Sequence, residues 1–250
     1  MKLKVTPIYR HDEHECPRMT YYQGDRIANW NDDMALHAAI ADFIACSQDP
    51  NIGSAAEGIV RGAAQRAVAL GEQNSRSNLE FLRLVLSKMG PLPGQHVIIL
   101  VSPGFLTPDA EAMTLKSEVL DIAARANVVI NALDARGLYT TNLDASQPGV
   151  VSTIASVEDQ YRQFSMLADE NVMAELADGT GGTFFHNNNN LEAGLSALLV
   201  GPEYLYLLAY STANMKPNGA YHDLKVKVNQ PRVTIQARRG YIAPKPGKTK

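Results

Sequence analysis

The sequence predicts an α/β protein in which helices flank a parallel β-sheet and a smaller antiparallel region follows. Its strongest signal is the run Val-Ile-Ile-Leu-Val at 97–101, which is continuously apolar and stops at Ser102-Pro103-Gly104. Strands covered on both faces of a parallel sheet show such runs without polar alternation. Helical and strand-like segments then alternate up to residue 185, as in βαβ units. Beyond residue 200 the segments are Tyr- and Val-rich with period two, which favours an antiparallel meander.

The predicted elements follow from periodicity, capping residues and helix breakers. In order they are a strand at 2–8, a helix from 32 to 45–47, helices at 54–70 and from 75 or 77 to 89, a strand at 96–101, a helix from 107–109 to 126, a strand at 127–133, a helix at 158–177, a strand at 183–185, a helix at 191–199, and strands at 204–210, 224–228 and 233–239.

Recognisable signals bound the helices that precede the first core strand. Asn31-Asp32 predicts an N-terminal cap, and the segment Gly-Pro-Leu-Pro-Gly at 90–94 ends the last of these helices. Residues 71–74, which begin with Gly71, indicate a break between two helices. The residues before 31 show little helical period, so we expect no helix there.

The βαβ region contains two segments of a different kind. Residues 138–157 follow neither period and are rich in Thr, Asn, Ser, Gly and Pro, which predicts a long surface loop. The segment Asp-Gly-Thr-Gly-Gly at 178–182 resembles a phosphate-binding loop. However, it joins a helix to a strand and contains no lysine, so it is interpreted as a helix C-cap.

We therefore predict four segments along the chain. They are an N-terminal strand, cysteine-containing loop and helix at 1–50, an α/β core at 51–200, an antiparallel β extension at 201–242, and a disordered tail at 243–250.

The composition is that of an ordinary globular protein. Of the 250 residues, 45% are hydrophobic and 20% are charged, and the formal net charge is −3, so no basic field would attract nucleic acid. The apolar runs fall far short of the roughly 20 residues that a membrane-spanning helix needs. The first seven residues contain charges but no apolar segment, so they do not form a signal peptide.

The two cysteines, Cys16 and Cys46, allow two interpretations. A disulfide between them would add roughly 3 kcal/mol to stability and would indicate an extracytoplasmic compartment. Two independent thiols in a cytosolic protein are the alternative. His11 and His14 lie just upstream and, with Cys16, suggest zinc, but no second ligand pair follows at suitable spacing. We expect the disulfide and no metal.

Several segments together resemble the von Willebrand factor A-related domains of environmental bacteria, notably the acidobacterial type. These segments are 97–106, 126–137 and 175–185, and the closing Ala-Arg-Arg-Gly-Tyr at 237–241. The resemblance covers residues 15–245. It implies a von Willebrand A-like, Rossmann-like fold, a secreted or periplasmic location, and similarity to adhesive, protein-binding modules.

The same resemblance implies a metal-dependent adhesion site, from which this chain departs. Such sites use an Asp-x-Ser-x-Ser segment after the first strand, a distant Thr, and an Asp after a middle strand. Here the turn that should hold this Asp contains Ser102-Pro103-Gly104, and the only similar segment, Asp144-Ala145-Ser146, lacks the second Ser and a preceding strand. We also expect the family's first strand and helix to be absent from this sequence, as if it started partway into such a domain. We expect a degenerate or missing site, the alternative being Mg²⁺ or Ca²⁺ binding completed by an upstream segment.

Ligands of open α/β sheets bind at the carboxyl ends of the strands, which places the candidate ligand-binding edge at Ser102, Gly104, Phe105, Asp134 and Arg136, with the loop 138–157. Asp134 and Arg136 also suit a local ion pair, the interpretation that we favour for them.

A hydrolase that uses Ser102 with His96 or His186 and Asp134 is a further alternative. It is disfavoured because Pro103 removes the backbone N–H that an oxyanion hole would use. We expect a non-enzymatic interaction module without a cofactor, whose partner is an unidentified protein or surface ligand.

Overall fold

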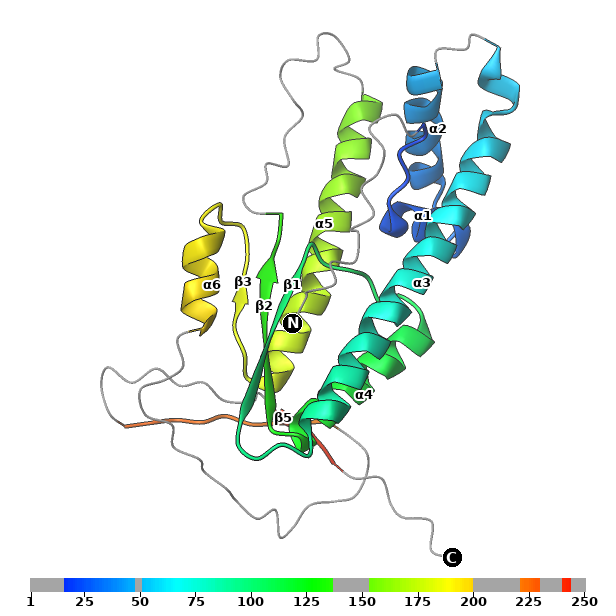
Figure 1. Ribbon diagram of the computed structural model, residues 1–250. Coiled ribbons are helices and arrows are strands. Elements are labelled where there is room, and N and C mark those ends of the chain that lie inside the picture. The colour runs from blue at the N-terminus through cyan, green and yellow to red at the C-terminus, as the bar shows by residue number, and fades with distance from the viewer. Residues whose placement is uncertain (1–15, 48–50, 137–152, 200–220, 230–239, 244–250) are drawn as a thin grey trace, which may run out of the picture. The chain divides into compact units, whose positions relative to one another are not determined.

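The computed structural model describes residues 16–47, 51–136, 153–199, 221–229 and 240–243 (Figure 1). The strands predicted at 2–8, 204–210 and 233–239 lie outside these residues, as do His11 and His14. The chain divides into two compact units, one formed by residues 1–71 and 141–166 and the other by 72–140 and 167–250. Two of the three division points, at 71/72 and 166/167, fall inside the long helices α3 (Ala56–Met89) and α5 (Thr153–Thr180), and the third, at 140/141, lies outside the described residues. Each unit is described separately below.

The first unit is built from helices. It contains α1 (Tyr21–Ala28), α2 (Asp33–Ser47), a short 3₁₀ helix η1 (Ile52–Ser54), the first part of α3 (Ala56–Met89) and the first part of α5 (Thr153–Thr180). The prediction that no helix precedes residue 31 is wrong. The helix α1 is short and its mean hydropathy is low, but Thr20 caps it by accepting a hydrogen bond from the Gln23 N–H at 3.1 Å.

The unit has its own hydrophobic core, which small and aliphatic side chains of α1, α2 and α3 form together with Tyr161 of α5. Its buried members are Met19, Ile27, Ala35, Leu36, Ala39, Phe43, Ala56, Val60, Ala63, Ala64 and Tyr161. The predicted disulfide is confirmed, with Cys16 and Cys46 bonded and their Cα atoms 5.9 Å apart. It ties the segment that precedes α1 to the end of α2.

The helix α3 runs unbroken from Ala56 to Met89, so the predicted break at residues 71–74 is wrong. Gly71 has a packing role instead. A Cβ atom at this position would lie only 2.2 Å from Cγ of Tyr21, so the glycine allows the Tyr21 ring to approach the helix. One glycine inside a long helix costs only about 1 kcal/mol relative to alanine, which the neighbouring turns of α3 tolerate.

The second unit is centred on a parallel sheet of three strands in the order β1 (His96–Ser102), β2 (Val128–Asp134) and β3 (Phe184–Phe185). The helix α4 (Ala110–Arg125) connects β1 to β2, α5 connects β2 to β3, and α6 (Leu191–Leu199) follows (Figure 1). This is the mixed α/β architecture that the sequence predicts. Asp109 caps α4 by accepting a hydrogen bond from the Ala112 N–H at 2.8 Å, as the predicted helix start at 107–109 implies.

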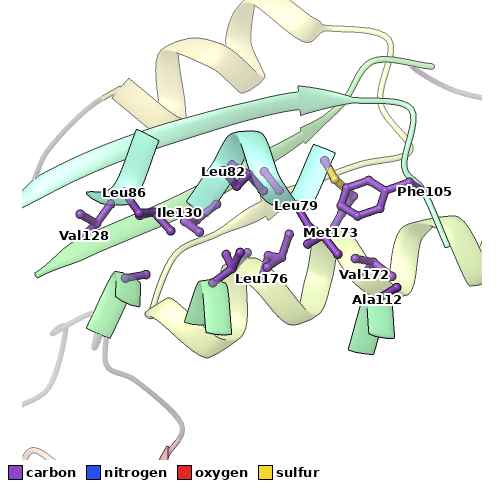
Figure 2. Close-up of a cluster of buried hydrophobic side chains, with 14 residues drawn as sticks. Leu79, Leu82, Leu86, Phe105, Ala112, Val128, Ile130, Val172, Met173 and Leu176 are labelled. Carbon is purple, nitrogen blue, oxygen red and sulfur yellow. The ribbon is translucent and has the colours of Figure 1, made fainter. Parts of the chain in front are cut away.

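One face of the sheet is covered by α3, α4 and α5 (Figure 2). Side chains of all three helices, such as Leu86, Val119 and Leu176, pack against Val128, Ile130 and Ala132 of β2. On the opposite face α6 covers β2 and β3. Asn131 of β2 donates to the carbonyl oxygen of Leu198 at 3.1 Å and accepts from the Thr183 N–H at 2.9 Å.

The prediction that the first core strand is buried on both faces is wrong. Among the described strands β1 lies at the edge of the sheet, and Val97 and Val101 are 54% and 55% exposed. Ile98 and Leu100 point to the other face and pack against the core. The apolar run therefore has cover on one face only within the described part of the chain.

The helix α5 begins at residue 153, so residues 153–157 are helical and not part of the predicted loop, whose other residues, 138–152, lie outside the described part of the chain. It ends at Thr180, where Gly181 has φ +76° and the Gly182 N–H donates to the Ala177 carbonyl oxygen at 2.8 Å. This geometry fits the predicted helix C-cap.

The carboxyl-terminal region contains β4 (Tyr221–Asp223) and β5 (Gly240–Ile242), which pair antiparallel. Residues 224–229 form no strand, so the strand predicted at 224–228 is wrong, and the described residues do not show the meander. Ala243 is buried, and residues 244–250 lie outside the described part. No helix of the described residues is long and apolar enough to cross a membrane.

Candidate functional site

The carboxyl ends of β1 and β2 meet at one edge of the sheet, as the parallel register requires. Ser102 pairs with Asp134 as the last residues of the two strands, and the Ala135 N–H donates to the Ser102 carbonyl oxygen at 3.0 Å. Three of the predicted site residues, Ser102, Asp134 and Arg136, therefore lie together at this edge.

A cluster of ion pairs holds Arg136 in place. The Asp134 carboxylate, which is 2% exposed as a residue, accepts from the Arg136 guanidinium through Nε at 2.9 Å and Nη2 at 2.8 Å, and from the Arg136 backbone N–H at 2.9 Å. Nη2 also donates to Oε1 of the buried Glu170 at 3.1 Å. This confirms an ion pair between Asp134 and Arg136 and adds Glu170 of α5, which the sequence did not indicate.

Electrostatics keep the guanidinium charged. Burial alone would lower the pKa of Arg136, but the hydrogen bonds to Asp134 and the charges of Asp134 and Glu170 outweigh it and leave this pKa above its ordinary value. Two buried carboxylates and one guanidinium thus form a network in which each charge has an opposite neighbour.

Asp169 lies beside this network. Burial raises the pKa of Asp169 to about 7, the nearby Arg136 opposes the rise and the negative charge of Asp134 adds to it. Gly104 packs directly against Asp169, because a Cβ atom at residue 104 would lie 2.7 Å from the Asp169 backbone oxygen, and its φ of +99° is one that glycine adopts readily. Gly104 of the β1–α4 connection therefore fits against α5 at this residue.

His186, which directly follows β3, lies near the same ion-pair network. Its ring stacks on Phe184, with centroids 4.6 Å apart and planes at 7°. Its Nδ1 lies 3.7 Å from Glu170 Oε2, an ion pair that exists only when the imidazole is protonated.

The remaining predicted site residues have structural contacts. Phe105 is buried in the core between the sheet and the helices (Figure 2), so its side chain is not exposed at the edge. The Ser102 hydroxyl accepts from the Gly104 N–H at 3.1 Å, which stabilises the turn that follows β1.

The serine–histidine pairs considered from the sequence are not formed. His96 begins β1, and its Nε2 contacts the Leu92 carbonyl oxygen. Because Ser102 ends the same strand, the two residues are about 20 Å apart. Ser102 makes no hydrogen bond to His186, although both residues lie in the described part of the chain. Neither imidazole is therefore placed to activate the Ser102 hydroxyl.

The described residues contain no group of three or more His, Cys, Asp or Glu side chains that could hold a metal ion. A shallow cavity of about 280 Å³ is lined by residues at the ends of α3 and α4, among them Gly90 and Ala126. Since these residues precede β1 and β2, the cavity lies at the amino ends of the strands, away from the candidate edge.

Reasoning from the sequence did not identify Asp169 or Glu170. It also did not identify the ion pair that a protonated His186 forms with Glu170. Asp169 and Glu170 lie in the middle of α5, where no motif marks them. The available signal was topological, since a helix that connects two parallel strands passes back across the sheet and brings some of its residues to the carboxyl ends.

Comparisons of the chain with family models, with curated proteins and with solved structures gave no match.

Proposed function

We propose that this protein is a non-enzymatic, extracytoplasmic interaction module that binds a protein or surface ligand at the carboxyl edge of its parallel sheet without a metal ion. The observation that carries the proposal is the position of the Arg136 guanidinium between Asp134 and Glu170.

This ion-pair network supports metal-independent binding for a chemical reason. A divalent cation at a sheet edge needs several oxygen ligands, usually including free carboxylates. At this edge the Asp134 carboxylate accepts four hydrogen bonds from the backbone N–H, Nε and Nη2 of Arg136, and the same guanidinium contacts Glu170. A bound cation would have to displace a charge that is already paired, at a large cost in a buried site.

The location of the edge and the disulfide support the other parts of the proposal. Open α/β sheets bind ligands outside the carboxyl ends of their strands, and Arg136 and His186 bring hydrogen-bond donors there. The Cys16–Cys46 disulfide is compatible with an oxidising compartment. Asp134 and Arg136 form an ion pair with each other, and this arrangement favours a preformed binding surface rather than a catalytic centre.

Titration calorimetry of the protein with MgCl₂ and CaCl₂ tests the absence of a metal. We expect no heat of binding for the wild type. Arg136→Gln serves as the informative variant, because it removes the internal cation and leaves the Asp134 and Glu170 carboxylates without their partner. Micromolar binding of either ion by the wild type would overturn the metal-independent proposal.

Site-specific photo-crosslinking tests the location of ligand binding. A photoreactive amino acid is placed at Ser102, on the candidate edge, and in a matched variant at Gln95, an exposed residue before the amino end of β1. With cell-envelope extract of the source organism and EDTA present, we expect a discrete adduct from position 102 and none from position 95. Adducts from both positions alike, or an adduct that disappears with EDTA, would contradict the proposal.

A further inference from the structure

We propose that strand β1 is a self-complementary edge through which two copies of this chain pair antiparallel and join their parallel sheets into one continuous sheet. This inference concerns the side of the sheet along β1 and does not rest on the ion-pair network at the carboxyl ends of the strands.

Strand β1 lacks the charged residues and proline that often protect an edge strand. Natural proteins protect edge strands with charged residues, prolines or bulges, because an open edge invites another strand. β1 contains five consecutive aliphatic residues, no charged Lys, Arg, Asp or Glu, and no proline. Within the described residues it has a strand neighbour on one side only.

The backbone of β1 is oriented for a second strand. The His96 N–H donates to the Asn127 carbonyl oxygen, and the Ser102 carbonyl oxygen accepts from the Ala135 N–H, so the even-numbered residues direct their peptide groups towards β2. Because peptide groups alternate along a strand, Val97, Ile99 and Val101 direct theirs to the outer edge. These are the residues that an added strand would bond.

The side chains are arranged symmetrically about Ile99. In the segment His-Val-Ile-Ile-Leu-Val-Ser, an antiparallel copy centred on Ile99 pairs Val97 with Val101, Ile98 with Leu100, and the polar His96 with Ser102. Since the centre is odd-numbered, Ile99 and its counterpart form a hydrogen-bonded pair, and so do both Val97–Val101 pairs. Backbone and side chains therefore select the same register.

This self-complementarity indicates that the strand added beside β1 belongs to a second copy of the chain. A two-fold interface brings the same patch of both subunits together, and pairs of β-branched residues across strands are favourable. No charge in β1 opposes the approach. Pairing through one seven-residue strand buries less than the roughly 1,200–2,000 Å² of a stable interface, so we expect a weak, concentration-dependent dimer.

Sedimentation velocity over a protein concentration series from about 1 µM to about 1 mM, a range that covers weak to moderate affinities, measures the association. We expect the wild-type mass to rise from that of one chain towards that of two. Leu84→Lys, which adds a charge at another exposed apolar residue of the same unit, is the matched control and is expected to leave the rise unchanged.

Two double variants test the register. Val97→Lys/Val101→Lys places like charges opposite each other across the two-fold axis and should abolish the dimer. Val97→Lys/Val101→Glu changes the same positions but places opposite charges face to face. We expect it to dimerise with at least tenfold higher affinity than the Lys/Lys variant. Within one chain the two positions are about 13 Å apart, so neither charge pair forms internally.

Two outcomes would overturn the proposal. They are a wild type that stays monomeric throughout the series, and a dimer on which the two double variants have the same effect. If the wild type is monomeric and its Val97→Lys variant also loses the folded circular dichroism spectrum, another part of the same chain covers β1.

Discussion

At the residue scale, Asp169 makes the candidate edge sensitive to pH. Its folded-state pKa of about 7 lies above the ordinary value of 3.8, so the folded protein holds this proton more tightly than the unfolded chain does. The stabilisation from Asp169 is therefore complete below about pH 4 and is lost as the pH rises through about 7.

We predict that Asp169→Asn removes this dependence. The free energy of unfolding of the variant relative to the wild type should increase by about 2–3 kcal/mol between pH 5 and pH 8. Urea unfolding followed by circular dichroism at the two pH values measures it. Glu192→Gln, at an exposed position of α6, is the control and should follow the wild type. An Asp169→Asn difference that is the same at both pH values would show that Asp169 is ionised throughout.

The sequence could predict the part of the site that is local in the chain. Ser102, Asp134 and Arg136 follow directly after strands, and a parallel register brings strand ends together. The orientation of Phe105 was not predictable, because the same apolar residue after a turn fits a ligand surface or a core. Asp169 and Glu170 were not predictable either, since their role depends on where α5 crosses the sheet.

At the element scale, α3 shows how tertiary packing determines the meaning of a glycine. In a solvated helix Gly→Ala stabilises by up to about 1 kcal/mol. At Gly71 the added methyl group would overlap the Tyr21 ring, and overpacking of this kind costs about 1–3 kcal/mol. We predict that Gly71→Ala lowers the free energy of unfolding by that amount, measured by chemical denaturation.

Two matched variants isolate the cause. Gly62→Ala, in the same helix, adds a methyl group whose nearest neighbour is the end of the Arg66 side chain at 3.6 Å, and should be neutral or stabilising. Tyr21→Ala should remove most of the penalty of Gly71→Ala when the two are combined. If Gly71→Ala proves as stable as Gly62→Ala, the contact with Tyr21 does not constrain α3.

The elements with strong local signals were predicted within a few residues. α4 and α6 have clear caps or periods, and the core strands are unmistakable runs. The helix α1 was missed because its eight residues include little apolar periodicity, although Thr20 followed by Gln23 is a capping signal. The break predicted at residues 71–74 does not exist in α3. A glycine followed by polar residues resembles a helix break as long as its packing partner, here Tyr21, is unknown.

At the scale of the whole molecule, the described residues form two hydrophobic cores, one in each unit. One is formed by α1, α2, the first part of α3 and Tyr161, and the other by the sheet with α4 and the second parts of α3 and α5. The sequence did not predict this division. Domain boundaries are usually sought in exposed linkers, whereas here two of the three division points fall within the continuous helices α3 and α5, which leave no compositional signal.

The division predicts a local effect of the disulfide. Cys16 and Cys46 are 30 residues apart in the sequence and lie wholly in the first unit, and closing a loop of this length contributes about 3–4 kcal/mol. We expect the double variant Cys16→Ser/Cys46→Ser to lose that amount of hydrogen-exchange protection in α1 and α2, with β1 and β2 protected as in the wild type. Reduction of the wild type should have the same effect, because only the covalent link changes. Exchange that accelerates equally in both units would instead mean that the two cores unfold as one cooperative structure.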